Sequence, residues 1–304
     1  MREIKILALV VIIIGVIYWG VEPLAHSVMH PKAQKTDFAF NDLNMINLQS
    51  VSHDTADIAA GKELFLNNCA SCHGIKSQNI PAPFDHAGSI DAFGVVAPDL
   101  GDVGGILDAH FLANFIKDPV KASLLSHKFK ISCEGEACDK QNEGKLDYPM
   151  NAFNGILSDD EIGHIVSFLV SIAPKDLSAK DIFLNTCTRC HSIKYDGVAS
   201  DTPEDSLEKY LGSKAPDLSI VIRAKEREYL DTFINNPQHA LAGTSMPRLG
   251  LNQEAQEKVI NYLESVGDSK KQERDSLGWK IMLFFAILTA LAYAWKRKIW
   301  KDVH

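Results

Sequence analysis

Two long apolar runs lie near the two ends of the chain, and the residues between them show a helical pattern. Residues 6–21 and residues 281–295 hold no charged side chain, and residues 277–280 extend the second run toward the middle of the chain. A helix that crosses a bilayer needs about 20 apolar residues. Both runs are therefore expected to be transmembrane anchors, within residues 1–24 and 277–296.

Between the anchors, apolar side chains recur every three or four residues, which is the spacing of an amphipathic helix. The pattern predicts helices over residues 56–68, 106–117, 159–172, 178–187, 226–235 and 253–266. Ser158 and Glu161 have the spacing of a capping box, which marks the start of the third helix. Alternating strand patterns are scarce, so the expected fold class is all-α.

Two pentapeptides of the form Cys-x-x-Cys-His carry the candidate chemistry. They contain Cys69, Cys72, His73, Cys187, Cys190 and His191. In an exported protein this motif attaches haem c, because the two thiols reach the two vinyl groups of one haem and the histidine becomes the proximal iron ligand. A zinc site or a redox dithiol is the alternative, but a zinc site needs four convergent ligands. The sequence predicts two covalently bound haem c groups.

The two motifs belong to an internal repeat. Three segments recur with the same shift of 118 residues: 62–69 at 180–187, 97–100 at 215–218, and 115–119 at 233–237. A register held over that length indicates two homologous domains, each with its own haem, which a zinc site would not explain. The domains are expected at residues 56–173 and 180–267, behind a linker at residues 25–55.

The register of the repeat breaks after Pro119 and Pro237. The first domain has 22 extra residues, an insertion near residues 120–145 that contains the two remaining cysteines, Cys133 and Cys138. No histidine follows Cys138, so this is not a third haem motif. An oxidising compartment favours a disulfide between them. Two free thiols are the alternative, and a metal site is the weakest interpretation.

The distal iron ligands follow by elimination among the six methionines. Four methionines lie before both haem motifs or in the second anchor, which leaves Met150 for the first haem and Met246 for the second. Each has a neighbouring proline and precedes a predicted helix. His110 and His127 remain alternatives at the first haem, and His239 at the second. Ligation by histidine and methionine fills both axial positions, which favours electron transfer over chemistry at the iron.

The distribution of charge predicts the topology. Basic residues flank the outer ends of the two apolar runs: Arg2, Lys5, Lys296, Arg297, Lys298 and Lys301. The positive-inside rule then places both termini in the cytoplasm and the residues between the anchors in the periplasm of a bacterial inner membrane. Haem c is attached to proteins in the periplasm, so the haem motifs predict the same location for the residues between the anchors. A cleaved signal peptide is the alternative for the first run, although no clear small-x-small cleavage site follows it.

The formal net charge of −8 is unevenly distributed along the chain. The two ends of the chain together carry +5, so the part between them carries −13. Such a surface attracts a basic partner at low salt, or it serves solubility alone. Nothing in the sequence favours nucleic-acid binding.

The arrangement of motifs resembles tandem class I cytochrome c domains. Residues 214–224, which contain Pro-Asp-Leu-Ser at residues 216–219, resemble the Pro-Asp-Leu-Ser segment of cytochrome c1, the haem subunit of the cytochrome bc1 complex. A single C-terminal helix with a basic tail is also similar to cytochrome c1. The usual member of that family holds one haem. This chain resembles instead the dihaem variants of some bacterial bc1 complexes, with an additional N-terminal anchor.

This resemblance implies a fold and the roles of two prolines. The implied fold is all-α, with two tandem class I cytochrome c domains between an N-terminal and a C-terminal transmembrane helix. Pro98 and Pro216 each follow their haem histidine by 25 residues. Class I domains have a proline at that place, whose carbonyl accepts a hydrogen bond from the proximal imidazole and orients the ring.

The resemblance also implies a function and partners. The expected function is electron transfer in a ubiquinol or menaquinol–cytochrome c reductase. The chain would accept electrons from the Rieske iron–sulfur protein and pass them to a periplasmic cytochrome c or a terminal oxidase. Cytochrome b would be a further subunit, and the complex would be dimeric. No catalytic chemistry is expected on this chain alone.

Two other functions are alternatives to this one. The dihaem subunit of a cbb3-type oxidase is anchored at its N-terminus and does not usually end in a helix, so residues 281–295 argue against it. A dihaem peroxidase needs one iron with an open or displaceable site. The presence of both Met150 and Met246 argues against a peroxidase.

The haem content can be measured directly. A pyridine haemochrome assay is expected to give two covalent haem c groups per chain. Cys72→Ala and Cys190→Ala should each lose one haem, because each removes one of the two thiols that hold it. A count of one haem in the unaltered chain would contradict the repeat described above.

Overall fold

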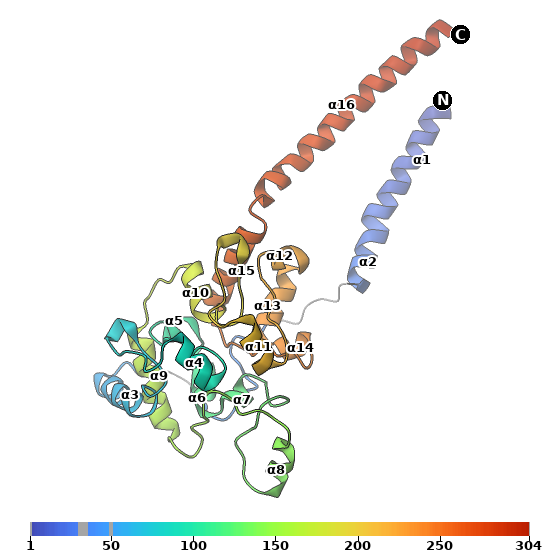
Figure 1. Cartoon of the computed structure of the whole chain (residues 1–304). Helices are drawn as coiled ribbons and strands as arrows, with labels where there is room; N and C mark the ends of the chain where they lie inside the picture. Colours follow the sequence, from blue (N-terminus) through green and yellow to red (C-terminus); the bar gives the residue numbers. More distant parts are fainter. Residues whose placement is uncertain (1, 30–35, 49–50, 304) are drawn as a thin grey trace. The chain divides into compact units, whose positions relative to one another are not determined.

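The computed structural model describes residues 2–29, 36–48 and 51–303, and they form helices joined by loops (Figure 1). Only isolated β-bridges, and no strands, occur within these residues. The all-α fold predicted from the sequence is therefore confirmed. Residues 30–35 and 49–50 of the predicted linker lie outside the described residues. The chain divides into two units, Met1–Asp37 and Phe38–His304.

The first unit is a run of consecutive helical segments. Its segments are α1 (Arg2–Val16), a π-helical turn η1 (Ile17–Val21) and α2 (Glu22–Met29). Residues Ile4–Met29 contain an 18-residue stretch with a mean hydropathy of 2.6 and are long enough to cross a membrane. The apolar run predicted at residues 6–21 lies inside this span.

The second unit ends in one long helix, α16 (Lys271–Val303). Its segment Lys271–Lys301 contains an 18-residue stretch with a mean hydropathy of 1.8 and is also long enough to cross a membrane. The predicted second anchor, residues 277–296, lies inside α16. Apolar side chains such as Leu283 and Phe285 are exposed along it, as expected for a helix that is covered by lipid.

Between the first and last helices of each repeat, four helices of the first repeat match four of the second residue for residue. The first repeat contains α4 (His86–Phe93), α5 (Val103–Ile106), α6 (Ala109–Lys117) and α7 (Pro119–Ala122), and the second contains α11 (Glu204–Leu211), α12 (Val221–Ala224), α13 (Arg227–Asn235) and α14 (Pro237–Ala240). The short 3₁₀ turns η2 (Lys76–Gln78) and η3 (Lys194–Asp196) correspond in the same way. The first and last residues of each of these helices lie 118 positions before those of its counterpart, which is the shift of the sequence repeat. The two halves are therefore copies of one fold.

The first and last helices of each repeat pack against each other to form its core. These pairs are α3 (Thr55–Asn68) with α9 (Asp159–Ile172), and α10 (Ala179–Thr186) with α15 (Gln253–Gly267). Aromatic rings meet at both contacts: Phe65 and Phe168 have centroids 5.8 Å apart, and Phe183 and Tyr262 have centroids 5.3 Å apart. Burial of large apolar side chains is thus the main stabilising contribution in each repeat.

Two local features fix the position of α9. A Cβ atom at Gly61 of α3 would lie 2.0 Å from the carbonyl oxygen of His164, so the close approach of the two helices requires glycine there. The start of α9 is held by the predicted capping box, because the Ser158 side chain accepts from the N–H of Glu161 and the Glu161 carboxylate accepts from the N–H of Ser158.

The helices predicted from apolar spacing are all present. They are α3, α6, α9, α10, α13 and α15, and each bound lies within three residues of the predicted one. Helices of four residues, such as α5, α7, α12 and α14, were not predicted, because they make about one turn and show no period.

Part of the predicted linker packs against the first repeat. Three side chains of residues 38–48 are buried: Phe40, Leu43 and Ile46. The side-chain oxygen of Asn114 accepts from the N–H groups of Met45 and Ile46 at 3.1 and 3.0 Å, and its amide nitrogen donates to the Ile46 carbonyl. Residues 38–48 therefore belong to the folded body, and their apolar spacing was too short to indicate this.

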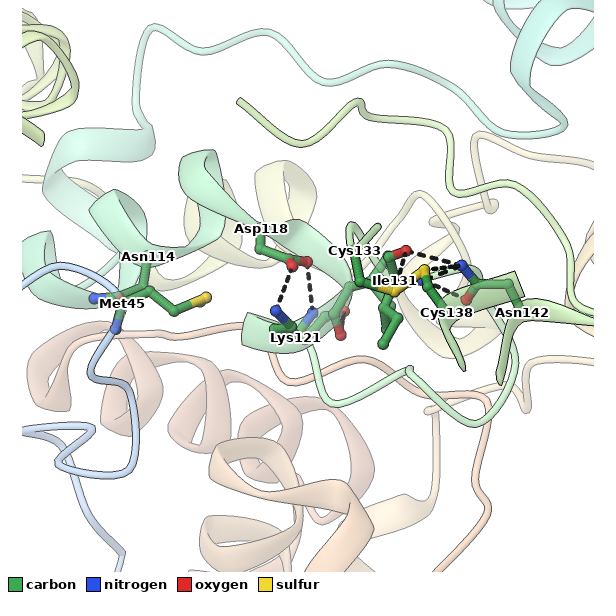
Figure 2. Close-up of polar contacts among 10 residues, drawn as sticks. Met45, Asn114, Asp118, Lys121, Ile131, Cys133, Cys138 and Asn142 are labelled. Atoms are coloured by element: carbon green, nitrogen blue, oxygen red, sulfur yellow. Dashed lines mark hydrogen bonds and ion pairs between the residues drawn. A yellow bond between two sulfur atoms is a disulfide. The ribbon is translucent and has the colours of Figure 1, made fainter. Parts of the chain in front are cut away.

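The insertion of the first repeat is closed by the predicted disulfide. Cys133 and Cys138 are bonded to each other at the start of α8 (Glu136–Asn142). Figure 2 shows the Asn142 side chain directed at this disulfide, where its amide nitrogen donates to the Ile131 carbonyl (3.1 Å) and to the Cys138 sulfur (3.3 Å). The disulfide and Asn142 together hold residues 131–142, of which only Cys138 is buried.

Backbone hydrogen bonds join the two repeats to each other. The N–H of Asp108 donates to the Gly250 carbonyl (2.9 Å), and the N–H of Asn252 donates to the Ile106 carbonyl (3.0 Å). Ile106 is 1% exposed and packs in the apolar core of the second repeat, although it belongs to the first. The two repeats are therefore not independent bodies joined by a flexible linker.

A buried arginine connects three parts of the folded body. Arg248 is 4% exposed and pairs with the carboxylate of Asp42 at 2.7 Å. Its N–H donates to the Ser123 carbonyl (3.0 Å), and its guanidinium lies 5.7 Å from the ring centroid of Phe40. Arg248 thus joins the second repeat to the first repeat and to residues 38–48.

Asp42→Asn should destabilise the folded body by about 1–2 kcal/mol, because it leaves the buried charge of Arg248 without its partner. Chemical denaturation of the full chain in detergent measures the change. Glu273→Gln is the matched control, since it breaks the exposed pair of Lys270 and Glu273 and should cost less than about 0.5 kcal/mol. Equal midpoints for Asp42→Asn and the unaltered chain would show that the Arg248 pair does not join the repeats.

Candidate functional site

The first Cys-x-x-Cys-His motif forms a tight turn at the end of α3. Cys69 caps this helix, and its N–H donates to the Phe65 carbonyl at 2.8 Å. The N–H groups of Cys72 and His73 both donate to the Cys69 carbonyl, at 3.1 and 2.9 Å. Backbone hydrogen bonds therefore hold two thiols and one imidazole on a single turn.

The second motif has the same geometry at the end of α10. The N–H of Cys187 donates to the Phe183 carbonyl at 2.9 Å, and the N–H groups of Cys190 and His191 donate to the Cys187 carbonyl at 3.1 and 2.8 Å. The four cysteines of the two motifs are half-buried and form no disulfide. Their thiols are thus free to bond to another group.

Each motif histidine lies within hydrogen-bond distance of a proline carbonyl. His73 Nδ1 is 3.0 Å from the carbonyl oxygen of Pro98, and His191 Nδ1 is 2.8 Å from that of Pro216. A carbonyl oxygen can only accept, so Nδ1 carries the proton and donates in both rings. Nε2 then keeps its lone pair, which is the arrangement that a metal-ligating histidine needs.

Both imidazoles are neutral near pH 7. Burial lowers the pKa of His73; the hydrogen bond to Pro98 opposes this shift, and the positive charge of Arg189 adds to it. Burial also lowers the pKa of His191, against the opposing hydrogen bond to Pro216. The neutral ring is the form that binds a metal ion.

The motif thiols do not have the properties of a zinc site. Burial raises the pKa of Cys69 and of Cys187 to about 11, so both thiols are protonated at neutral pH. Zinc sites and redox dithiols act through thiolates. Among the described residues, no group of three or more His, Cys, Asp or Glu side chains is arranged to hold a metal ion. Two thiols and one neutral imidazole on each turn fit the attachment of haem c.

Asp99 fixes the loop that carries Pro98, although the sequence pattern assigned it no role. Its carboxylate accepts from the N–H groups of Lys76 and Gly101, at 3.0 and 2.9 Å. Lys76 lies just after the first motif, so this contact closes the loop onto the attachment turn. The sequence feature that could have indicated this role is the aspartate that directly follows both Pro98 and Pro216.

Asp217 has the corresponding position in the second repeat. Its carboxylate accepts from the N–H groups of Lys194 and Ser219, both at 3.0 Å, and from the Ser192 hydroxyl at 2.9 Å. Burial alone would raise the pKa of Asp217, but these hydrogen bonds outweigh it and lower the pKa to about 2. The carboxylate is therefore charged at neutral pH and holds the loop of Pro216 against the second motif.

The predicted distal ligands lie in the loops that precede the last helix of each repeat. Met150 is half-buried and packs against the core of the first repeat. Met246 is half-buried, and its N–H donates to the Thr244 hydroxyl at 3.3 Å. Neither methionine belongs to an attachment turn, and the role of each as an iron ligand stays a prediction.

The competing histidines have other environments. His110 lies on α6 with its Nε2 2.9 Å from the Leu43 carbonyl, so this nitrogen holds the segment of residues 38–48. His127 and His239 are exposed to solvent. These environments favour methionine over histidine as the distal ligand at both sites.

Comparison with known proteins identifies the repeats. A family model described as Cytochrome c matches residues 58–173 and matches residues 178–267 separately. The two matches together cover more than half of the chain, and each contains one of the attachment turns.

The chain is also similar to two proteins that are named as cytochromes. Cytochrome c1 of Allochromatium vinosum is 24% identical, over 40% of this chain and 82% of that protein. The cytochrome bc1 complex cytochrome c subunit of Mycobacterium leprae is 26% identical, over 74% of this chain and 66% of that protein. A solved structure described as "Hyperthermophilic respiratory Complex III" has a TM-score of 0.31 and 18% identity, over 96% of this chain and 99% of that chain. That score is too low to support any inference about this protein.

The distal ligands can be tested by spectroscopy. Both ferric haems should be low-spin with a near-infrared charge-transfer band from methionine to iron. Met246→His should remove one such band and lower the potential of that haem, because imidazole favours the ferric state more than a thioether does. His239→Gln is the control and should leave both bands in place. If Met150→His and Met246→His both left the spectrum unchanged, the methionines would not be the ligands.

Proposed function

This chain belongs to the cytochrome c family, and we propose that it is the dihaem electron-transfer subunit of a quinol–cytochrome c oxidoreductase. It is a cytochrome c-type electron-transfer subunit related to the cytochrome subunits of bc1 complexes. The observation that carries the proposal is the doubled attachment turn. At each of the two copies, 118 residues apart, a neutral histidine donates to a proline carbonyl.

Each proposed domain, residues 56–173 and 180–267, holds one haem c. The thiols of the first motif hold one haem and those of the second motif hold the other: Cys69 and Cys72, then Cys187 and Cys190. His73 and His191 are the proximal ligands, and Met150 and Met246 are the distal ones. A bound haem c supplies a one-electron couple between ferric and ferrous iron.

Groups of the protein fix the orientation of the histidines that are proposed to bind the two irons. The carbonyls of Pro98 and Pro216 fix the orientation of the two imidazoles and keep the proton on Nδ1. Asp99 and Asp217 hold the two proline loops in place. A histidine and a methionine holding each iron would leave no place for a substrate, so each haem would serve electron transfer.

Both terminal helices anchor the chain in the membrane. The helical spans Ile4–Met29 and Lys271–Lys301 are each longer than the roughly 20 residues that cross a bilayer. Lys298 and Lys301 lie at the C-terminal end of the second span, and positive residues of this kind stay in the cytoplasm. The two domains then face the periplasm of a bacterial inner membrane, which is where haem c is attached.

The proposed partners follow from this location. Cytochrome b and the Rieske iron–sulfur protein are the other subunits of a dimeric complex. The chain accepts electrons from the Rieske protein and passes them to a periplasmic cytochrome c or to a terminal oxidase. The net charge of −13 between the anchors attracts a basic acceptor.

Purification in mild detergent tests this function. An affinity tag on this chain should recover b haem and a Rieske centre in constant ratio to haem c, detected by optical and electron paramagnetic resonance spectra. The purified complex should reduce a soluble cytochrome c when quinol is added. Haem c that purifies without b haem or a Rieske centre would contradict the proposal.

A shortened chain serves as the internal control. A chain that ends at Ser276 lacks the apolar part of α16, but it keeps both attachment turns and the first span. It should remain in the membrane fraction with two haems and recover less b haem, because the C-terminal helix is proposed to dock on the membrane subunit. Release of this chain into the periplasm would show that the first span is a cleaved signal.

A further inference from the structure

Lys128 belongs to the insertion of the first repeat, but its ammonium donates to two groups of the second repeat. These groups are the carbonyl of Leu211, the last residue of α11, and the hydroxyl of Ser245. They lie 83 and 117 residues further along the chain. A side chain of one repeat therefore binds two separate segments of the other.

Lys128 completes the C-terminal end of α11. The last carbonyls of a helix have no partner within the helix, and this end carries a partial negative charge. Gly212 follows Leu211 with a φ of 68°, so α11 stops at this point. A half-buried ammonium that binds the Leu211 carbonyl satisfies the helix end and matches its charge.

An apolar contact fixes the stem of Lys128. The next residue, Phe129, is 0% exposed, and its ring centroid lies 5.3 Å from that of Tyr210 on α11. Tyr210 and Leu211 both pack against the small core that contains Phe129 and Leu125. Because this core includes residues of both repeats, the ammonium of Lys128 is held at the end of α11.

Ser245, the second acceptor, directly precedes the proposed distal ligand Met246. Its hydroxyl donates to the Leu211 carbonyl at 3.0 Å and accepts from the Ser213 hydroxyl at 3.0 Å, in addition to accepting from Lys128. Hydrogen bonds from a charged donor are roughly twice as strong as those between neutral groups. Lys128 is thus the strongest donor in the network that holds the residue before Met246.

The first repeat also contacts the residues after Met246. We call residues 245–250 the Met246 loop. The N–H of Arg248 donates to the Ser123 carbonyl (3.0 Å), and the Gly250 carbonyl accepts from the N–H of Asp108 (2.9 Å). A Cβ atom at Gly250 would lie 1.9 Å from the ring of Phe111, and its φ is 70°. The first repeat therefore supports the Met246 loop at residues 245, 248 and 250.

The loop of the other proposed distal ligand, Met150, is held by its own repeat. The N–H of Phe153 donates to the Ile116 carbonyl (3.3 Å), and that of Asn154 donates to the Lys117 carbonyl (3.0 Å). Both carbonyls belong to α6 of the first repeat. The two loops thus differ, because only the Met246 loop is described here with support from the opposite repeat.

We propose that Lys128 is a positioning residue for the distal ligand of the second haem, so that the first repeat determines how firmly Met246 is held at the second iron. This inference rests on the proposed function, because it takes Met246 as a ligand of an attached haem. A neutral thioether is a weak ligand, and groups that fix the position of a ligand strengthen its bond to the metal.

A titration with imidazole measures how firmly each methionine is held, because imidazole in solution competes with methionine for the iron. In the haem-loaded full chain, Met150→His leaves Met246 as the source of the near-infrared charge-transfer band. Adding Lys128→Met to this chain should lower the imidazole concentration that removes half of the band by about tenfold, since a charge-assisted contact is lost.

The reciprocal background shows whether the effect is confined to one haem. In a chain with Met246→His, the band comes from Met150, and Lys128→Met should leave its titration unchanged. A general loss of stability would move both titrations. An equal shift of the Met150 and Met246 titrations would therefore overturn the positioning role.

Lys145→Met is the matched control. Lys145 is also half-buried in the insertion, but its ammonium donates to the Ser126 carbonyl (2.6 Å) within the first repeat. This variant should leave both titrations unchanged. An effect as large as that of Lys128→Met would overturn the role assigned to the contact between repeats.

Ser245→Ala tests the same contact from the second repeat. It should weaken the Met246 band in the same direction, and its combination with Lys128→Met should have a smaller effect than the sum of the two single effects. Fully additive effects would show that Lys128 does not act through Ser245. Should Lys128→Met fail to take up haem, Ser245→Ala provides the same titration.

Hydrogen exchange measured by mass spectrometry gives a readout that does not depend on iron ligation. In the full chain, Lys128→Met should speed the exchange of backbone amides within residues 241–250, and Lys145→Met should not. Unchanged exchange and an unchanged Met246 titration, in Lys128→Met and in Ser245→Ala, would overturn this inference and leave the proposed function intact, since two haems remain attached.

Two further outcomes are distinct from that one. A Met150→His chain that holds two haems but lacks the near-infrared band would show that Met246 is not a ligand, which also overturns this inference. A wild-type chain without haem c would overturn the proposed function itself.

Discussion

The hydrogen bond from a motif histidine to a proline carbonyl determines how each repeat folds. For Pro98 to reach His73, the chain between them must form a closed loop, and α4 lies within that loop. Two more contacts close it, from the Asp99 carboxylate to the N–H of Lys76 and from the N–H of Leu100 to the Gly74 carbonyl (3.0 Å). The second repeat closes its loop in the same way, so a change at this bond would displace a whole loop and not one side chain.

The contacts between the repeats give the two proposed haem sites a fixed relation. Ile106 completes the core of the second repeat, and Arg248 reaches from the second repeat to Ser123 and Asp42. A further hydrogen bond joins the side chains of Asn185 and Asp102 at 2.7 Å. Electron transfer between two centres depends steeply on their separation. Packing of this kind keeps that separation constant without any additional subunit.

Much of this arrangement could be predicted from the sequence, because it depends on residues that are close together in the chain. The attachment turns, the capping box of Ser158 and the helices that frame each core all have local patterns. No local pattern predicts that Phe40 packs against the first repeat, because this packing depends on a contact with Phe111 of α6. The ion pair of Arg248 with Asp42 could not be predicted either, because the two residues are 206 positions apart in the chain.

Ile106 belongs to the first repeat but packs in the core of the second, and this bears on the order in which the two repeats fold. A polypeptide is synthesised from its N-terminus, so the first repeat is complete while Leu251, Val259 and Leu263 are still missing. Until they arrive, Ile106 has no core to enter and remains uncovered on a nascent chain. The second repeat, in turn, cannot close its core without a side chain made more than 140 residues earlier. The core of the second repeat is thus expected to form after the first repeat has supplied Ile106.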